Sequence, residues 1–529
     1  MSRQPESAHL DDRVRELAQR YRPLAVEILR EAIRIPHDYV DRPADEGGDP
    51  ACGLSNHEGP RLRYLQQALR DHGCVAAEDD TWFDAYGNLV WVVQDPGDGI
   101  DPAQKKVVYM DGHSDTVKAL RPQWPAKAGA GLDAYLGLTD PAAVDRAFLR
   151  RELGYVPPDD AWEHLVFGRG SADQLGGVVC QMVASKVLLE LRAEGALRGA
   201  IVRCYATAAE EDNDGGGPMH LTREVLPGAG PELIPDCVIL SEGTGDSRKG
   251  AVGIYRGQRG RMQIEVEVSG RSCHGSMPWE GLNPLEFGAG ILVEAAAEAA
   301  AGEGFADDAF LGRGTRTASW SELETPSDCA VPERFTVRFD RRLTAGEDPE
   351  AARAAVEALP AVARAREAGL GVEVRVPTYA QDTWRGYPQT NPQIYPGWVT
   401  PEEHEVIQAA VDVYGRAVAP GVSEAEHAAQ QRGETPGGRR RDCRVDRWIF
   451  STDGVGFPVP KHGSGVAVPA SKGWIDQGRY HHPPMFGCGP GLEQNTHKIG
   501  ECVDARELES VIAFMARFPS RLAERAGLA

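Results

Sequence analysis

Histidine and carboxylate side chains stand at the ends of several predicted strands, where they could bind metal ions. The first group is the segment DGHSDT at 111–116, which follows a short hydrophobic stretch. His113 can bind a metal ion through one ring nitrogen, and Asp115 can accept the N–H of the other nitrogen and so fix the tautomer. A single histidine after a strand more often serves polar packing, but the His-x-Asp pair makes metal binding an equally good interpretation.

Two further segments add carboxylates. The segment GRGSADQLGG at 168–177 places glycines on both sides of Asp173, which lets the backbone turn tightly and approach an ion. Because a carboxylate has two oxygens, Asp173 could bridge two metal ions. The segment AAEEDND at 208–214 holds four acids in five positions, which repel one another unless cations neutralise them. In a metal site Glu211 would be a ligand and Glu210 would move protons, whereas this segment alone could also be an acidic turn in solvent.

The last two segments complete a possible ligand set. Glu242 lies in the segment SEG at 241–243, and His497 lies in NTHK at 495–498, after a glycine-rich stretch. A hydrolase with two metal ions needs imidazole and carboxylate ligands together with one carboxylate left free as a base. The five segments therefore predict a site in which a water held between two ions attacks an amide-type bond.

These segments need a scaffold that positions them. Apolar stretches and helical periodicity predict strands at 106–110, 201–207 and 237–240, and helices at 11–35, 59–71, 176–191 and 504–518. Buried strands that alternate with helices are typical of an α/β domain with a mainly parallel sheet flanked by helices. Each of the five segments follows a predicted strand or opens a loop.

The sequence pattern changes near residue 260. The stretches 262–268, 335–339 and 372–376 alternate apolar and polar residues, as strands of a sheet with one face in water do. Between them an alanine-rich helix is expected at 284–301. We therefore predict an inserted α+β domain at 258–378, between the two parts of the α/β domain at 1–257 and 379–529.

Two segments lack regular periodicity. In the connection 117–167, Asp140 as N-cap, Pro141 in the first turn and Gly154 past the end predict one short helix. The Gly- and Arg-rich stretch 431–447 is expected to be a mobile, solvated loop, although its arginines could also attract an anionic substrate.

Composition argues against several classes of function. A net charge of -22 and a pI near 5.1 argue against binding nucleic acid or an anionic membrane through a basic surface. No apolar run of about twenty residues predicts a transmembrane helix, and the first residues lack the apolar core of a signal peptide. The ten cysteines include no CxxC pair, which favours reduced thiols and a cytoplasmic protein. The sequence also lacks a phosphate-binding Gly-Lys-Ser/Thr loop, which disfavours a nucleotide-binding protein.

In their order along the chain, the five segments resemble those of the ArgE/DapE/aminoacylase-type family of metallopeptidases and amidohydrolases. That family includes acetylornithine deacetylase, succinyl-diaminopimelate desuccinylase and glutamate carboxypeptidase. The resemblance covers nearly the whole chain except the two irregular segments. It implies a zinc-peptidase-like catalytic domain with an inserted lid and dimerisation domain, and a cis peptide bond between Asp173 and Gln174.

The resemblance also implies a role for each candidate residue. The implied ligands are a bridging carboxylate and one pair of residues for each ion, namely Asp173, His113 with Glu242, and Glu211 with His497. Glu210 is the implied general base, and Asp115 supports His113. The two divalent ions are expected to be Zn²⁺, with Mn²⁺ or Co²⁺ as alternatives.

A further motif lies in the predicted inserted domain. The segment SCHGSMP at 272–278 matches the family's His-x-Ser-x-Pro motif. The resemblance implies that His274 stabilises the oxyanion, in many members from the partner subunit of a dimer, and that Asn283 contacts substrate. The segments YRGQRG at 255–260 and DRRLT at 340–344 look most like a branch linked to selenium metabolism, a label that identifies no reaction.

The predicted function is hydrolysis of an amide-type bond in an N-acyl amino acid, a dipeptide or a related small molecule. The expected protein is a cytoplasmic homodimer with no nucleic-acid or membrane partner. Hydrolysis of carbamoyl or ureido compounds, and non-catalytic metal binding by the same fold, stay as alternatives. The connection 117–167 and the stretch 456–482 look longer than is usual in the family, and both could reshape the substrate pocket.

Overall fold

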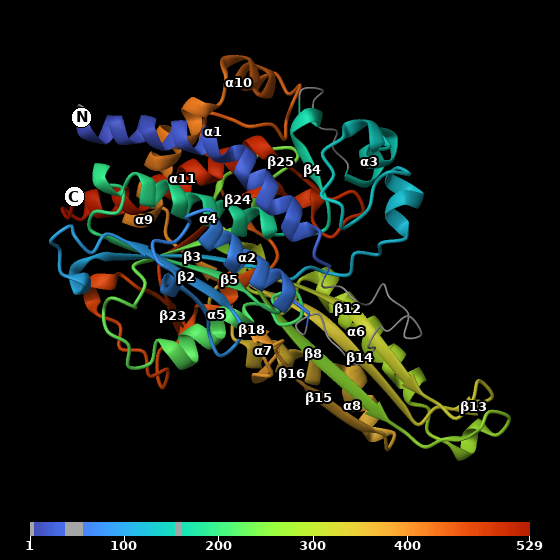
Figure 1. The fold of residues 1–529 in the computed structure, drawn as a ribbon. Helices are drawn as coiled ribbons and strands as arrows, with labels where there is room; N and C mark the ends of the chain where they lie inside the picture. The colour runs from blue at the N-terminus through green and yellow to red at the C-terminus, as the bar shows by residue number, and fades with distance from the viewer. Residues whose placement is uncertain (1–4, 37–56, 154–160) are drawn as a thin grey trace.

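The centre of the fold is a mixed sheet whose middle strands are parallel (Figure 1). The computed structural model describes residues 5–36, 57–153 and 161–529, and within them this sheet has nine strands. Strands β5, β3, β6 and β24 run parallel to one another, β1, β2 and β19 are antiparallel to their neighbours, and β7 is antiparallel to β24 and β19 but parallel to β20. In sheet order the strands are β1 (Thr81–Phe83), β2 (Leu89–Gln94), β5 (Ala200–Thr207), β3 (Lys106–His113), β6 (Cys237–Gly245), β24 (Met485–Leu492), β7 (Ile254–Gln258) and β19 (Trp398–Val399). The ninth strand, β20 (Val445–Trp448), also pairs with β7.

Long helices cover one face of this sheet, because its central strands are apolar on both sides. Helix α4 (Leu175–Glu190) is buried along most of its length and packs against β3 and β6. Helix α11 (Ala505–Arg525) packs against α4 and against α1 (Pro5–Ile33). Helices α2 (Gly59–Asp71) and α9 (Glu405–Val413) complete this layer through contacts with α1 and α11.

Shorter segments cover the other face of the large sheet. Leu221 and Leu226, which follow the short helix α5 (Gly216–His220), pack there with Phe457 against the tyrosines and tryptophans of the sheet. The predicted extension 456–482 folds beside them into a small antiparallel sheet, whose strands are β21 (Val459–Pro460), β23 (Tyr480–His482) and β22 (Ile475–Gln477). This extension therefore adds to the core of the sheet.

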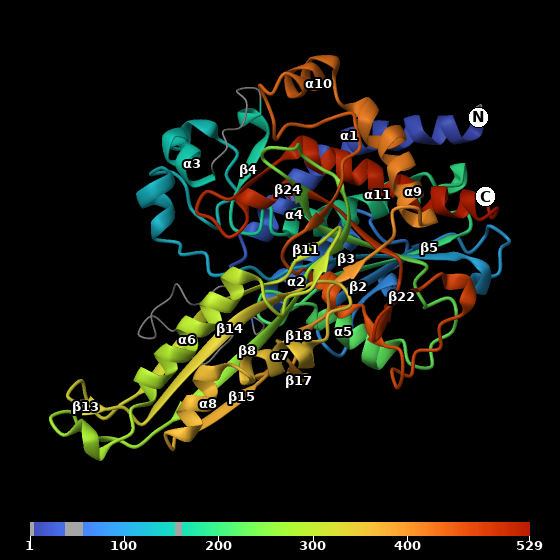
Figure 2. The same cartoon turned by 180° about the vertical axis from the view of Figure 1, so that it is seen from behind.

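A second sheet extends away from the first like an arm (Figures 1 and 2). Within the described residues it has five antiparallel strands, in the order β12 (Thr315–Glu324), β14 (Arg334–Leu343), β8 (Gly260–Ser269) and β15 (Gly371–Arg375), with β18 (Ile394–Tyr395) also paired to β8. Alternate residues of β8 are buried against three helices, which are α6 (Pro284–Ala301), α7 (Pro349–Glu357) and α8 (Pro360–Glu367). The domain limits at 258 and 378 stay a prediction.

Smaller elements complete the described chain. The remaining helices are α3 (Arg146–Leu153) and α10 (Glu424–Gln431). The remaining strands form two-stranded ladders, namely β4 (Leu165–Phe167) with β25 (Cys502–Asp504), β9 (Cys273–His274) with β13 (Ala330–Val331), β10 (Asp307–Asp308) with β11 (Gly312–Arg313), and β16 (Thr378–Asp382) with β17 (Pro388–Pro392). None of the helices among the described residues is long and apolar enough to cross a membrane.

Some helix boundaries differ from the prediction, and the first helix, α1, covers Pro5–Ile33 where 11–35 was expected. The helix expected after Asp140 is divided into a short turn at Pro141–Ala143 and α3, because Asp145 accepts the N–H groups of residues 147 and 148 and caps a second helix; Gly154 lies outside the described residues. Helix α11 continues past Pro519, since Leu522 and Ala523 are buried.

The Gly- and Arg-rich stretch 431–447 is held in place by its own arginines, contrary to the mobile loop that its composition predicts. Arg439 pairs with Glu426 at 2.8 Å, and Arg441 donates to the carbonyl of Val422 at 2.9 Å. Arg444 is buried and donates to the hydroxyl of Tyr255 at 2.9 Å. These bonds tie the stretch to α10 and to the large sheet.

Candidate metal centre

The predicted ligands meet at one edge of the large sheet, where the parallel strands end. His113 is the last residue of β3, and its register partner Thr207 is the last residue of β5. The acidic segment with Glu210 and Glu211 therefore begins beside His113. Glu242 lies within β6, which pairs with β3 on the other side. Asp173 precedes α4, and His497 follows β24.

The Asp173 carboxylate lies between two imidazoles. Its Oδ1 atom is 3.0 Å from Nε2 of His113, and its Oδ2 atom is 3.0 Å from Nε2 of His497. The peptide bond between Asp173 and Gln174 is cis, as the family resemblance predicts. One carboxylate thus faces both halves of the candidate site.

Each imidazole also faces a glutamate. Nε2 of His113 is 3.6 Å from Oε2 of Glu242, and Nε2 of His497 is 3.2 Å from Oε2 of Glu211. Glu210 is a third glutamate, with Oε2 at 3.8 Å from Nε2 of His113. All three glutamates line the same cavity of about 440 Å³.

Asp115 holds both the imidazole and the acidic segment. One of its carboxylate oxygens is 3.4 Å from Nδ1 of His113, and its backbone carbonyl is 3.0 Å from the same nitrogen. Its two carboxylate oxygens accept the backbone N–H groups of Glu210 at 3.2 Å and Glu211 at 2.9 Å. Asp115 is fully buried, so these bonds fix the direction in which three site residues point.

The close carboxylates change how the imidazoles hold protons. Burial would lower the pKa of His113, but the hydrogen-bonding carboxylates of Asp115 and Asp173 outweigh it and raise this pKa well above the usual value. Burial would also lower the pKa of His497, but the carboxylates of Asp173 and Glu211 outweigh it and raise this pKa to about 11. Without cations the imidazoles therefore keep protons, and metal binding would release them.

The pKa values of two glutamates are raised as well, but here burial is the main cause. Burial raises the pKa of Glu242 to about 7, and the charge of Asp173 adds to the rise. Burial also raises the pKa of Glu210 well above the usual value, against the opposing charge of His113. A carboxyl group whose pKa is raised can accept and return a proton near neutral pH.

The donor atoms suit a pair of divalent metal ions. Ligand atoms of His113, Asp173 and Glu211 all lie within 4.8 Å of one another, and Oε2 of Glu242 is 3.6 Å from the same Nε2 atom of His113 that faces Asp173. Imidazole nitrogen with carboxylate oxygen is a donor set that Zn²⁺, Mn²⁺ and Co²⁺ accept. Buried carboxylates at such distances need cations to offset their mutual repulsion.

Comparison with known proteins identifies the family. Residues 256–365 match the model of the peptidase dimerisation domain of the M20 family. The uncharacterized protein YgeY of Escherichia coli K12 is 31% identical over 357 residues, which make up 68% of this chain and 73% of YgeY. The chain belongs to the M20 (ArgE/DapE-type) family. It is a metal-dependent hydrolase that acts on C–N bonds of small molecules.

Two other similarities fit this M20 assignment. Succinyl-diaminopimelate desuccinylase of Gluconobacter oxydans is 34% identical over 142 residues, which cover 25% of this chain and 35% of that enzyme. The solved structure of the dipeptidase Dug1p from Saccharomyces cerevisiae superposes with a TM-score of 0.60 at 12% identity, over 98% of this chain and 99% of that one. The second likeness supports the M20 fold: a catalytic α/β unit that carries an inserted α+β lid and dimerisation unit.

Two residues to which the family resemblance gives a role, His274 and Asn283, lie away from the proposed metal ligands of the same chain. His274 lies on β9, which pairs with β13 near the far end of the arm (Figure 1). Its Nδ1 atom is 2.8 Å from the hydroxyl of Ser276. Asn283 caps α6, where its side chain accepts the N–H of Leu285 at 3.1 Å. Neither is among the described residues that line the metal-site cavity. The roles predicted for His274 and Asn283 stay predictions.

The sequence did not predict the opposite wall of the cavity, which belongs partly to the arm. Arg261 of β8 pairs with Asp214, and the hydroxyl of Ser451 donates to the other oxygen of that carboxylate. Arg342 of β14 donates to Ser451 at 3.1 Å and pairs with Asp340 at 2.8 Å. These five residues form a network between the two sheets, and the sequence signals for it were the acidic segment that ends at Asp214 and the DRRLT segment, noted for its likeness alone.

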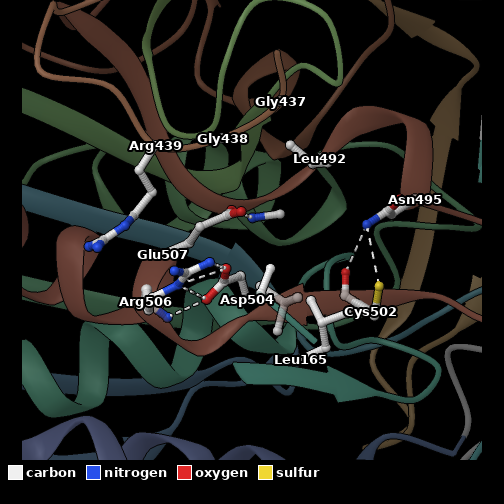
Figure 3. A pocket seen from close by; sticks show the side chains of 13 residues that line it. Leu165, Gly437, Gly438, Arg439, Leu492, Asn495, Cys502, Asp504, Arg506 and Glu507 are labelled. Carbon is white, nitrogen blue, oxygen red and sulfur yellow. Dashed lines mark hydrogen bonds and ion pairs between the residues drawn. The ribbon is translucent and has the colours of Figure 1, made fainter. Parts of the chain in front are cut away.

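The loop that carries His497 is fixed from behind. Figure 3 shows a small cavity on that side, lined by residues of α11, β25 and the Gly- and Arg-rich stretch. There the carboxylate of Glu507 accepts the N–H of Gly491 at 2.8 Å, and Asn495 donates to the carbonyl of Cys502 at 3.0 Å. The loop is therefore held near both ends, and His497 itself has a positive φ of 59°.

Proposed function

We propose that the protein hydrolyses N-acyl amino acids or dipeptides at a site with two Zn²⁺ ions. The arrangement of Asp173 between His113 and His497 carries this proposal, because each imidazole faces one further glutamate. In this assignment Asp173 would hold both ions, while His113 with Glu242 and Glu211 with His497 would complete the two sites. Glu210 lines the same cavity and is left as the base.

When bound, the ions polarise the scissile carbonyl and lower the pKa of an attacking water from 15.7 towards about 7. Glu210 takes a proton from that water as it attacks, and returns it to the leaving nitrogen. Asp115 keeps His113 in the orientation that a ligand needs. His274 of a second copy of the chain stabilises the oxyanion that forms on the substrate, with Asn283 positioning the substrate in the same arm.

The arginines of the cavity support a substrate that carries a carboxylate. Arg261 and Arg342 line the cavity together with Glu210 and Glu242. Guanidinium groups bind carboxylates through paired, charge-assisted hydrogen bonds, so these two can hold the free acid of an amino acid product. Both arginines now bind Asp214 or Asp340, and a substrate carboxylate would exchange with those groups.

A substrate panel tests this function. The metal-free protein is loaded with Zn²⁺, Mn²⁺ or Co²⁺ and offered N-acetyl amino acids, dipeptides and N-carbamoyl amino acids, each beside its carboxamide counterpart. Turnover of an acyl or peptide substrate with a free carboxylate, lost on chelation, is the expected result. Turnover confined to carbamoyl compounds would favour the alternative chemistry, and metal binding without any turnover would favour a binding protein.

A further inference from the structure

Glu501 lies behind the proposed metal ligands and joins two of the segments that carry them. It stands four residues after His497, and its side chain is fully buried. Its Oε1 atom accepts the backbone N–H groups of Ala172 at 3.0 Å and Asp173 at 3.1 Å. One carboxylate thus fixes the backbone of the bridging residue from the end of the His497 loop.

Arg169 completes this arrangement. Its guanidinium donates to Oε2 of Glu501 at 2.5 Å, and the Arg169 side chain is as deeply buried as its partner. Charge-assisted hydrogen bonds between buried groups are short and directional, so they restrict the backbone they hold. The pair therefore limits the positions that Asp173 can take.

Arg169 is in turn held by the long connection 117–167. Its backbone N–H donates to the carbonyl of Ala134 at 2.8 Å, and its guanidinium lies 5.9 Å from the ring centre of Trp124. Trp124 is fully buried, donates to the carbonyl of Ala119 at 2.7 Å, and belongs to a separate hydrophobic core built mainly from this connection. The described residues of the connection thus form a folded unit that packs against Arg169.

The same connection reaches a second ligand. The backbone N–H of Val117, its first residue, donates to Oε1 of Glu211 at 3.0 Å. The oxygen of Glu211 that faces His497 is the other one, Oε2. Two carboxylates of the metal site are therefore oriented from this one segment.

We propose that Arg169 and Glu501 are positioning residues for the metal centre, and that the connection 117–167 braces them through Trp124. This inference rests on the proposed metal ligands and adds a role for the connection. It predicts that the affinity for metal depends on groups that do not touch the ions. Partners behind metal ligands typically contribute a factor of about 10–100 to affinity.

The test is a zinc titration of metal-free protein against a chromophoric chelator, combined with the thermal midpoint of the metal-free form. Glu501→Gln is expected to lower zinc affinity about 10–100-fold. Trp124→Leu, which removes the ring beside Arg169, is expected to lower it about threefold or more. Asp11→Asn is the matched control, because Asp11 is a buried carboxylate paired with Arg517 at 2.6 Å between α1 and α11.

Asp11→Asn is expected to keep wild-type zinc affinity, whatever its effect on the thermal midpoint. Wild-type affinity in Glu501→Gln, or an equal loss in Asp11→Asn, would overturn the positioning role, and wild-type affinity in Trp124→Leu would overturn the brace. If Glu501→Gln does not fold, Arg169→Lys decides by the same criterion. A wild-type protein that binds no zinc would instead refute the proposed metal site itself.

Discussion

Replacing Glu210 with glutamine separates the base from the ligands. The amide has nearly the size of the carboxyl group, and the backbone N–H of residue 210 keeps its bond to Asp115. His113, Asp173 and the other ligands keep their positions. The substitution therefore removes a proton acceptor with a raised pKa and leaves the proposed metal set intact.

The expected loss follows from the role of a general base. Positioned proton transfer contributes about 10²–10⁴ in rate, which at 1.36 kcal/mol for each factor of ten is about 3–5 kcal/mol of transition-state stabilisation. The loss should fall on kcat, because Glu210 binds no part of the substrate in this account. Metal content and metal affinity should stay within about a factor of two of wild type.

The assay is steady-state hydrolysis of the best substrate from the panel, with metal content measured on the same samples. Unchanged kcat in Glu210→Gln would refute the assignment of the base. A variant that lost its metal would show that Glu210 is a ligand, so the division between Glu210 and Glu211 would be wrong.

Three further predictions follow from other parts of the structure. Arg342→Ala should raise KM about 10–100-fold for substrates with a free carboxylate and leave their carboxamides nearly unchanged, since hydrogen bonds to charged groups are lost only with the former; equal effects on both would refute carboxylate recognition. Co-expressed His274→Ala and Glu210→Gln chains should form mixed dimers with about half of wild-type activity, because one site then has both groups; inactive mixed dimers would contradict a role across the dimer. Burial lowers the pKa of His482 to about 4, so its share of stability is complete above about pH 6.5 and is lost as the pH falls towards 4. Over that whole pH range the loss is about 3 kcal/mol. Between pH 7.5 and pH 5, urea unfolding should show a smaller decrease in the free energy of unfolding for His482→Gln than for wild type, and equal decreases would contradict this origin.

Local signals explain why many elements were predicted well. Helix α6 runs from Pro284 to Ala301 as expected, because Asn283 caps its start and Gly302, with a positive φ of 74°, ends it. The ligand segments were found because His113, with Asp115 two residues later, follows a strand that is apolar enough to recognise. Such signals need no knowledge of distant contacts.

Features that depend on tertiary contacts were missed or misjudged. Arg261 and Arg342 lie on strands of the arm and reach the cavity only because the two sheets meet there, so their local sequence does not show that they line it. The arginine-rich stretch was expected to be mobile, but Arg439 pairs with Glu426 of α10, and Arg444 bonds to Tyr255, which lies far away in the sequence. Glu501 was overlooked for the same reason, since its partners precede it by more than three hundred residues.

The most direct test of the account is the amount of metal bound per chain. Elemental analysis of freshly purified protein, and of His113→Ala and His497→Ala, measures it without knowledge of the substrate. The account predicts about two ions per wild-type chain and a loss in each variant, because each imidazole serves a different ion. Protein that binds no metal, even after incubation with zinc, manganese or cobalt, would contradict it.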